Sequence, residues 1–464
     1  DGGYIVAGSS GSNDGDVTGN HDGSDFWITK LSAMGSIEWQ KSLGGSANDQ
    51  AHSVQQTADH GYIIVGFSVS SDGDVGGNQG NYDFWIVKLS PSGSIQWQNS
   101  LGGSESDTAY DIKQTSDGGY LILGNSSSVD GDVTGNHGFA DYWLVKLNAN
   151  GMMEYQSSFG GSGYDLAREI QPTNDGGHIL VGNSSSNDGD VTGNHGSGDY
   201  WVVKISQTGS LVWQKSFGGS DGDYANSIKQ TEDGGYIIAG TSYSNDGDVT
   251  ESYGNGDYWI IKISETGNIE WQKSFGGSGE DIANEIQVVA GGYIVIGGTE
   301  STDGDVSGNH GNVDYWIIKL SESGDLQWQK AMGGSSFDEG LSIAQTNDKG
   351  FILAGGSNSN NGDVTGNHGE QDYWIVKLEP DPLDIVEFKS DINIYPNPAS
   401  SFLNISAKEP IKSVSFYNHL SQLVKNSSHG ETEVQLNVSE LSSNIYLMVV
   451  TTEKSLQTFK IIIK

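Results

Sequence analysis

Four short runs of apolar residues recur along most of the chain, each bounded by clusters of Gly, Asn, Asp and Ser. In one copy they occupy residues 61–66, 84–89, 95–98 and 110–114, and all four are rich in β-branched and aromatic residues. Such runs predict β-strands separated by turns. No segment of this region sustains the i, i+3, i+4, i+7 apolar spacing of an amphipathic helix. We therefore predict an all-β fold.

These runs belong to a repeat that is marked by a tryptophan in its second strand. The seven copies stand 58 residues apart, with one spacing of 57, at Trp27, Trp85, Trp143, Trp201, Trp259, Trp316 and Trp374. Four strands per copy predict a seven-bladed β-propeller-like array with one blade per copy. The period lies somewhat above the roughly 40–50 residues of known blade repeats, and a long loop accounts for the surplus. A β-solenoid is the alternative, although its rungs are usually shorter.

The strand count bears on how the ring closes. The first and second strand types occur seven times, whereas the third and fourth occur six times. We expect one strand of each rarer type, supplied from upstream of residue 1, to complete a seventh blade and leave no open edge. Residues 383–388 are an alternative source of one of them. Because residues 1–6 already belong to a repeat, we expect an upstream segment that includes any export signal.

All twelve tryptophans occupy only two repeat positions. Seven mark the second strand, and the others lie in the third strand at Trp39, Trp97, Trp213, Trp271 and Trp328, with Tyr155 replacing the sixth. This regularity favours packing between neighbouring blades. A platform for sugars, the alternative, need not recur in every blade.

The net charge of the chain limits the classes of partner that it can bind. Sixty acidic residues against 22 basic ones give a formal net charge of −38, so nucleic acid and anionic membranes are poor partners. Divalent cations held by oxygen ligands are better ones. The chain has no cysteine, which excludes disulfides, thiolate catalysis and Cys-based zinc sites. No stretch approaches the roughly 18 apolar residues of a transmembrane helix, and we expect a monomer.

The loop between the first two strands carries the most candidate chemistry. Counted from Asp14, oxygen-bearing residues stand at positions 1, 3, 5, 7 and 12 with Gly at 6, which is the ligand spacing of an EF-hand calcium loop. Ca²⁺ is therefore the one cofactor we expect. The candidate ligands are Asp14, Asp16, Asn20, Asp25, Asp72, Asp74, Asn78, Asp83, Asp130, Asp132, Asn136, Asp141, Asp188, Asp190, Asn194, Asp199, Asp303, Asp305, Asn309 and Asp314.

A plain turn is the alternative for this loop. Position 12 is Asp rather than Glu, no helices flank the loop, and Glu251 replaces the glycine in the fifth copy. In such a turn the Asp side chains satisfy backbone groups of the loop. The recurring loop histidines are expected to be surface residues, because they repeat with the blades at His21, His137, His195, His310 and His368.

The repeat stops after Leu378. Two prolines, Pro380 and Pro382, predict a linker over residues 379–390. We therefore divide the chain into a repeat domain at residues 1–378 and a separate β-rich domain at residues 391–464. The second domain carries six sequence elements at residues 394–398, 403–405, 414–418, 438–441, 445–447 and 460–464.

In the order and spacing of these elements, beginning with the Tyr-Pro-Asn-Pro run at 395–398, the domain resembles the type A C-terminal sorting domain of the type IX secretion system. The resemblance implies a small β-sandwich that the secretion machinery recognises and that is usually cleaved. It also implies an extracellular or outer-membrane surface location in a Gram-negative bacterium. The repeat region resembles uncharacterised propeller-like arrays of such cargo, which names no activity.

Two functions remain open for the repeat domain. The favoured one is a non-enzymatic scaffold for binding or adhesion to a glycan or protein, through variable loops on a rigid propeller. The alternative is an extracellular polysaccharide-acting, endoglucanase-like hydrolase, or its accessory domain, with a carboxylate pair as acid and base. A catalytic pair should break the repeat symmetry. The departures from symmetry are Arg168, Glu251, Tyr243, Tyr253 and Phe139, and Arg168 is expected to be an ordinary exposed position.

Overall fold

The computed structural model describes residues 2–380, 392–418, 422–452 and 456–464. The regular secondary structure of these residues consists of β-strands alone. The chain divides into two compact units, Asp1–Asp381 and Pro382–Lys464. Most of the predicted linker lies outside the described residues, so its structure stays a prediction. No helix in the described part of the chain is long and apolar enough to cross a membrane.

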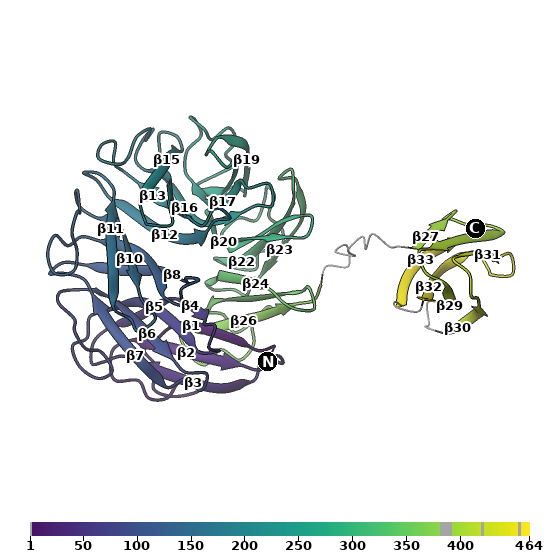
Figure 1. The fold of residues 1–464 in the computed structure, drawn as a ribbon, viewed down its shortest axis with the longest axis horizontal. Helices are drawn as coiled ribbons and strands as arrows, with labels where there is room; N and C mark the ends of the chain where they lie inside the picture. Colours follow the sequence, from purple (N-terminus) through teal and green to yellow (C-terminus); the bar gives the residue numbers. More distant parts are fainter. Residues whose placement is uncertain (1, 381–391, 419–421, 453–455) are drawn as a thin grey trace. The chain divides into compact units, whose positions relative to one another are not determined.

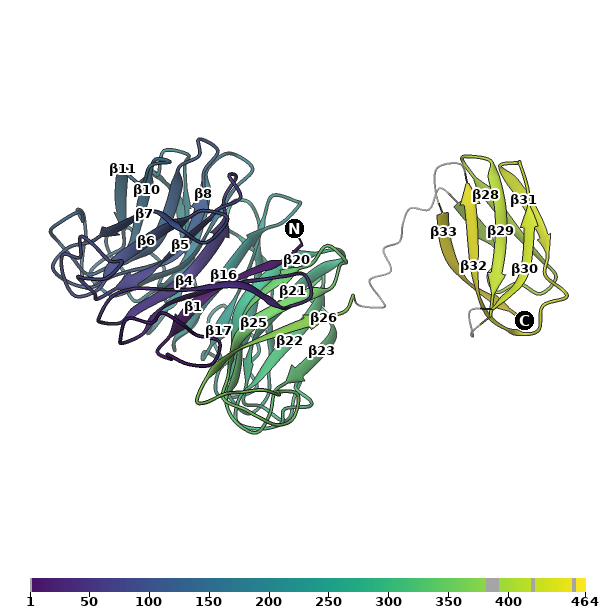
Figure 2. The same ribbon diagram turned by 90° about the horizontal axis from the view of Figure 1, so that it is seen from below.

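The first unit is a ring of seven antiparallel sheets around a central axis (Figure 1). Each complete sheet begins at the axis with the fourth strand type of one copy and continues outward with the first, second and third types of the next copy. Seen from below the view of Figure 1, the strands run between the two faces of the ring (Figure 2). The predicted all-β, propeller-like array of seven blades is confirmed.

The strands of the first unit follow one another in chain order. Blade 1 contains β1 (Tyr4–Ser10), β2 (Asp25–Leu31) and β3 (Ile37–Leu43); blade 2 contains β4 (Asp49–Gln56), β5 (Tyr62–Ser68), β6 (Asp83–Leu89) and β7 (Ile95–Leu101); blade 3 contains β8 (Asp107–Gln114), β9 (Tyr120–Ser126), β10 (Asp141–Leu147) and β11 (Met153–Phe159). Blade 4 contains β12 (Asp165–Pro172), β13 (His178–Ser184), β14 (Asp199–Ile205) and β15 (Leu211–Phe217); blade 5 contains β16 (Asp223–Gln230), β17 (Tyr236–Ser242), β18 (Asp257–Ile263) and β19 (Ile269–Phe275). Blade 6 contains β20 (Asp281–Val289), β21 (Gly292–Thr299), β22 (Asp314–Ser321) and β23 (Leu326–Met332); blade 7 contains β24 (Asp338–Gln345), β25 (Phe351–Ser357) and β26 (Asp372–Leu378).

The first and last blades each have three strands. Blade 1 has no innermost strand beside β1, and blade 7 has no outermost strand beside β26, among the residues described. The prediction that the two unmatched strand positions fall in a single incomplete blade is therefore wrong. It failed because each sheet begins with the fourth strand type of the preceding copy, so the sheets are offset from the sequence repeat. Residues 383–388, the alternative source of a strand, lie outside the described residues.

The hydrophobic core lies between neighbouring blades. Trp201 of blade 4 packs on Tyr142 of blade 3 with ring centroids 4.6 Å apart, and the same pairing recurs around the ring. The third-strand tryptophans pack in the opposite direction, onto the following blade, since Trp97 of blade 2 meets Tyr120 of blade 3 at 5.8 Å. The predicted role of the tryptophans in packing between blades is confirmed.

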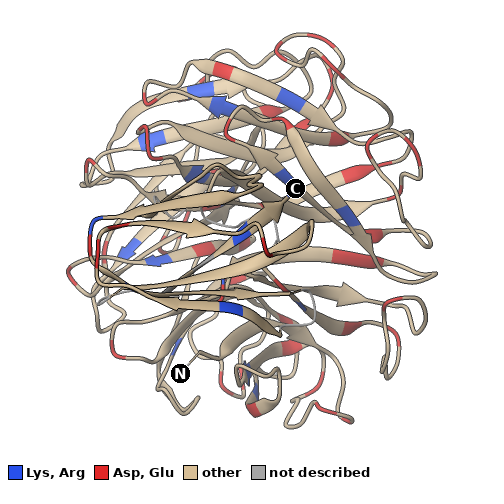
Figure 3. Ribbon diagram, turned by 90° about the vertical axis from the view of Figure 1, so that its right-hand side faces the viewer, with Lys and Arg blue, Asp and Glu red and all other residues tan. Residues whose placement is uncertain are grey.

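Buried lysines hold each blade together from within. Lys88 is 3% exposed, and its Nζ lies 2.9 Å from a carboxylate oxygen of Asp59 and 3.0 Å from the Leu89 carbonyl oxygen. Hydrogen bonds from Thr57 and Lys88 lower the pKa of Asp59 to about 2. Figure 3 shows the general pattern, with many lysines on strands and most acidic residues in loops. The net negative charge is therefore carried mainly by loops.

The second unit contains two sheets that share one core. One sheet has the order β27-β28-β31 and the other β30-β29-β32-β33, and buried side chains such as Leu403, Phe416 and Met448 belong to one cluster. Its strands are β27 (Ile392–Tyr395), β28 (Phe402–Ala407), β29 (Ile411–Tyr417), β30 (Leu423–Ser428), β31 (Glu433–Asn437), β32 (Asn444–Thr452) and β33 (Leu456–Ile463). This is the small β-sandwich that the sequence predicts.

Candidate functional site

The acidic loops bind backbone groups of the preceding blade. Asp72 Oδ1 accepts a hydrogen bond from the Ser46 N–H at 2.7 Å, and Asp74 Oδ2 accepts one from the Gly44 N–H at 3.4 Å. Gly44 and Ser46 belong to the Gly-Gly-Ser turn that connects blade 1 to blade 2. The first two candidate ligands of this loop therefore fasten one blade to the next.

The other two candidate ligands of this loop point elsewhere. Asn78 donates to the Ser68 carbonyl oxygen at 3.0 Å, and its own oxygen accepts from the Gly80 N–H. Asp83 Oδ2 accepts from the Gln79 N–H. Among the described residues, no group of three or more His, Asp or Glu side chains is placed to share a metal ion. Calcium binding by these loops stays a prediction that titration can test.

In six of the seven acidic loops, the last Asp forms a buried pair with the Asp that begins the next innermost strand. Asp141 and Asp165 are both 0% exposed, and a Cβ at Gly160 would lie 2.6 Å from an oxygen of each. Burial raises the pKa of both carboxyls, although His137 bound to Asp141 and Ser184 bound to Asp165 oppose the shift. The pair recurs at six interfaces as Asp25/Asp49, Asp83/Asp107, Asp141/Asp165, Asp199/Asp223, Asp257/Asp281 and Asp314/Asp338. A buried, repeated pair of this kind has no access to substrate.

The loop histidines belong to the same arrangement. His137 Nδ1 lies 2.7 Å from Asp141 Oδ2, and the His137 side chain is 41% exposed. In blade 2 the residue at this position is Gln79. Its backbone N–H donates to Asp83, and its side chain does not bind that carboxylate. His21, His137, His195 and His310 are thus half-exposed loop residues that bind a buried carboxylate, whereas His368 is exposed and its partner Asp372 is half-exposed.

The innermost strands carry charged residues that differ between blades. Asp111 Oδ2 accepts from the Ile170 N–H at 3.1 Å, and Glu169 accepts from the Ile228 N–H at 2.6 Å. Lys113 pairs with Asp111 and Lys229 pairs with Glu169. These carboxylates bind backbone groups of the next blade beside its β-bulge, so this part of the asymmetry is structural.

A second set of asymmetric side chains forms a continuous stack on blades 2 to 4, which we call the inner stack. It consists of Tyr82, Phe67, His52, Tyr110 and Arg168. The His52 and Tyr110 rings are 4.8 Å apart and nearly parallel at 8°, and the Arg168 guanidinium lies 4.6 Å from the Tyr110 ring centroid. The other end runs from His52 to Phe67 at 5.7 Å and from Phe67 to Tyr82 at 4.7 Å.

The inner stack corrects one prediction. Arg168 is half-buried on β12 rather than being an ordinary exposed residue. Its neighbours Tyr110 and His52 occupy the same repeat position in the two preceding blades, and the sequence gives no sign that the three side chains stack. In the sequence, these three residues are distinguished only by their departure from the repeat.

Exposed aromatic pairs lie on the face that carries the long loops, at the ends where the second strands begin. The Phe139 and Tyr164 rings stack at 5.0 Å and 15°, and their side chains are 63% and 53% exposed. Tyr224 and Tyr243 form an edge contact at 6.0 Å, and the Tyr243 hydroxyl donates to Glu280. Phe139 and Tyr243 are two of the departures from symmetry that the sequence identifies. We call this surface the long-loop face.

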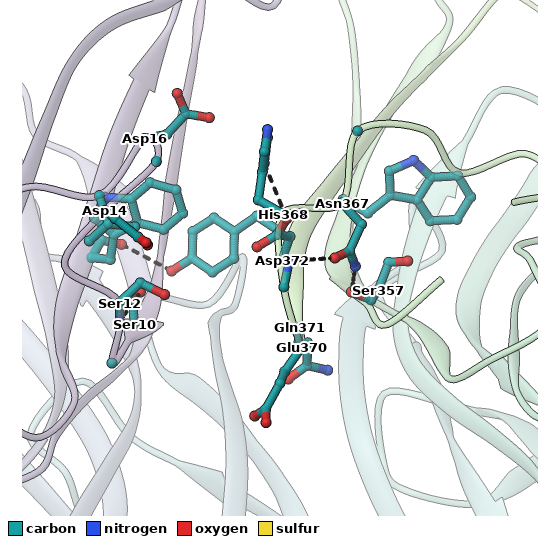
Figure 4. Close-up of a pocket in the computed structure, with 18 of the residues that line it drawn as sticks. Ser10, Ser12, Asp14, Asp16, Ser357, Asn367, His368, Glu370, Gln371 and Asp372 are labelled. Atoms are coloured by element: carbon teal, nitrogen blue, oxygen red, sulfur yellow. Dashed lines mark hydrogen bonds and ion pairs between the residues drawn. The ribbon is translucent and has the colours of Figure 1, made fainter. Parts of the chain in front are cut away.

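A pocket of about 670 Å³ lies where the last blade meets the first. Figure 4 shows Ser10, Ser12, Asp14 and Asp16 on one side and Asn367, His368 and Asp372 on the other. Beside it the Tyr373 hydroxyl donates to the Trp27 carbonyl oxygen at 3.1 Å. We call this junction the seam.

Residues 393–464 match the family model described as the secretion system C-terminal sorting domain. The second unit is a type IX sorting domain. The sorting domain confirms the predicted export route, which leads to the cell surface or the extracellular space of a Gram-negative bacterium, and it is the part through which the secretion machinery is engaged. No curated protein matches the sequence of the chain.

Solved structures show only distant likeness. PorZ, an essential bacterial surface component of the type IX secretion system of Porphyromonas gingivalis, matches with a TM-score of 0.42 and 11% identity over 99% of this chain and 58% of its own. A Synechocystis apocarotenoid oxygenase mutant matches with a TM-score of 0.40 and 13% identity over 69% and 70%. Puromycin hydrolase matches with a TM-score of 0.42 and 10% identity over 83% and 56%. The chain thus spans less than two thirds of PorZ, and no activity is transferred from these proteins.

Proposed function

We propose that the exported protein is a non-enzymatic binding scaffold whose ligand docks on the long-loop face. The observation that carries this proposal is the placement of the asymmetric aromatic residues. These residues lie on neighbouring blades: the inner stack on blades 2 to 4, the Phe139–Tyr164 pair between blades 3 and 4, and the Tyr224–Tyr243 pair on blade 5. In contrast, the inter-blade core and the acidic loops follow the repeat. Binding residues on loops that a rigid framework positions are typical of such scaffolds.

The carboxylates argue against hydrolysis as the main activity. Polysaccharide hydrolysis needs two carboxyl groups that reach the scissile bond. The paired carboxyls of this ring, such as Asp141 and Asp165, are 0% exposed and repeat at six interfaces. In the seam pocket, Asp14, Asp16 and Asp372 are also members of the repeat, whereas Glu370 has no counterpart in the other blades. A single unrepeated carboxylate does not make the pair that hydrolysis needs.

A neutral glycan is the ligand class that this surface favours. Exposed, nearly parallel rings such as Phe139 and Tyr164 offer flat faces on which sugars can stack. The formal net charge of −38 repels acidic polysaccharides. A protein partner would use the same rings, and it is an alternative outcome of the test.

Glycan screening of the full chain tests the proposal. The Phe139→Ala/Tyr164→Ala variant should bind its neutral glycan about ten-fold more weakly, because each stacked ring contributes roughly 0.5–1.5 kcal/mol. Met152→Ala is the matched control, since this side chain is 61% exposed in the same blade but lies in the turn at the opposite end of β10. Equal affinity of both variants, or binding to proteins alone, would overturn the glycan proposal.

A further inference from the structure

The seam differs from the six other junctions between blades. At those junctions the second strands are buried, as β10 is along its full length, and a hydrophobic cluster fills the space between the sheets. At the seam, β1 and β26 are half-exposed and both are sheet edges. No hydrophobic cluster of the described residues joins blade 7 to blade 1.

At the six regular junctions one kind of segment fills this space. It consists of an outermost strand, a Gly-Gly-Ser turn and the innermost strand of the next blade. Between blades 2 and 3, the Ser104 N–H binds Asp130 Oδ1 at 2.8 Å, and the Gly102 N–H binds Asp132 Oδ2 at 3.3 Å. The Asp107 carboxylate of the same segment accepts hydrogen bonds from the Ser128 hydroxyl and the Gly103 N–H, both at 2.8 Å.

The repeat places the same binding groups at the seam. Ser10, Ser12, Asp14 and Asp16 stand where blade 3 has Ser126, Ser128, Asp130 and Asp132. The first four line the seam pocket (Figure 4). Within the described residues, Asp14 and Asp16 have no side-chain hydrogen bond, and Ser12 Oγ has none either. The seam therefore offers a complete set of hydrogen-bonding groups for a Gly-Gly-Ser segment.

We infer that the seam is an acceptor site for a strand–turn–strand polypeptide segment with the repeat's own pattern, Gly-Gly-Ser with an Asp three positions after the Ser. The occupant is a segment other than the six found in residues 1–464, because each of those already fills its own junction. Its first strand would pair with the free edge of β26, and its last strand would pair with the free edge of β1.

The regular blades give the expected register. In blade 2, Leu101 pairs with Phe84 and Trp97 pairs with Lys88, so the matching residues of the segment would lie beside Tyr373 and Lys377. In blade 3, Asp107 pairs with Ser126 and Gln114 pairs with Tyr120. The corresponding partners at the seam are Ser10 and Tyr4.

The glycines of the segment provide a stringent control. At a regular junction, a Cβ at Gly102 would lie 2.5 Å from Asp83 Oδ1 and 2.6 Å from Asp107 Oδ2, and a Cβ at Gly103 would lie 2.5 Å from the Asp130 carbonyl oxygen. A segment with Ala at both positions therefore cannot bind in the same site unless these carboxylate and carbonyl oxygens are displaced. A segment with Gly at both positions fits.

A synthetic peptide of residues 95–114 tests the inference on the full chain by calorimetry. We expect one peptide to bind per chain, and Asp14→Asn/Asp16→Asn to weaken binding about ten-fold, because hydrogen bonds to charged acceptors are lost. The matched control is Asp22→Asn, which removes one charge from the same loop at an exposed position outside the pocket. The peptide with Ala in place of Gly102 and Gly103 should not bind.

A fusion gives an independent measurement. Residues 95–116 placed directly ahead of Asp1 reproduce the natural spacing, because Asp1-Gly2-Gly3-Tyr4 corresponds to residues 117–120. The fused chain should melt at a higher temperature and should no longer bind the free peptide. No binding of the peptide together with no rise in melting temperature would overturn the inference. A concentration-dependent dimer that the peptide cannot dissociate would overturn it too, by assigning the seam to a second copy of the chain.

Discussion

Lowering the pH from 7.5 to 5 should stabilise the propeller unit. Burial raises the pKa of Asp83 and of Asp223 to about 6, against an ordinary value of 3.8. The folded state of each group then binds a proton in a pH range where the unfolded state does not. Stability from such a group is fully present below the unfolded pKa and is lost as the pH rises through the folded pKa. Each carboxyl should contribute about 1.4 kcal/mol between the two pH values.

Most other shifted groups act in the same direction, and two buried histidines oppose it. Burial lowers the pKa of His178 to about 4 and also lowers the pKa of His52, so their contributions are lost as the pH falls below about 6.5. The carboxyls outnumber them, because burial also raises the pKa of eight further Asp residues of the inter-blade pairs. A hydrogen bond from His21 to Asp25 raises the pKa of His21, so its contribution is also lost as the pH rises. Asp59 and Asp117 have a pKa lowered to about 2, and their contributions fade only when the pH falls from about 4 towards 2. Stability should therefore be greatest at about pH 4–5.

Thermal melts of the full chain at the two pH values measure the effect. Asp83→Asn is the sharpest variant, because the residue that faces Asp83 is Gln79 rather than a titrating histidine, and an amide oxygen can still accept the Gln79 N–H. This variant should melt higher than the unchanged chain at pH 7.5 and should show a smaller pH effect. If the unchanged chain melted at the same or a higher temperature at pH 7.5 than at pH 5, the argument from buried carboxyls would be refuted.

Three further outcomes can be checked, two of them by the same melts and the third by titration calorimetry together with melts. Gly160→Ala should cost about 2–3 kcal/mol, since its Cβ would press on two buried carboxyls, whereas Gly369→Ala, with nothing within 4 Å of its Cβ, should be neutral. Lys204→Met should cost about 1 kcal/mol and raise the pH of acid unfolding, because Asp175 loses a partner at 2.9 Å. Calcium titration tests the loop ligands: several equivalents bound with a higher melting temperature would support calcium binding, and no heat with no shift would contradict it.

The architecture followed from the sequence because the repeat encodes it redundantly. Trp201 and its six counterparts fix the period, and the Gly, Asn and Asp clusters fix the turns, so one wrong boundary could not change the fold class. The offset between repeat and blade was not predictable in the same way. Whether Asp107–Gln114 pairs with the strand before it or the strand after it depends on packing in the ring, which a count of strand types does not contain.

The candidate site followed from the sequence only in part. Phe139, Tyr243 and Arg168 stood out because they break the repeat, but their partners Tyr164, Tyr224 and Tyr110 lie about 25, 19 and 58 positions away. The contacts of Phe139 and Arg168 form across blade junctions, and the contact of Tyr243 joins the ends of two strands of one blade. In neither case does a local sequence pattern relate the two residues. The acidic loops had the opposite difficulty. Their spacing is shared by a calcium loop and by a set of backbone acceptors, and only the positions of the N–H groups distinguish the two.

The repeat therefore separates two kinds of surface in this protein. A repeated carboxylate such as Asp130 serves the fold, because its partner, the Ser104 N–H, is also repeated. The same carboxylate at the seam, Asp14, has no such partner among the described residues, so an element of the fold becomes a surface that can bind. The aromatic residues of the long-loop face are free to vary because no junction depends on them. A ligand for that face and a segment for the seam can thus be recognised independently on one scaffold.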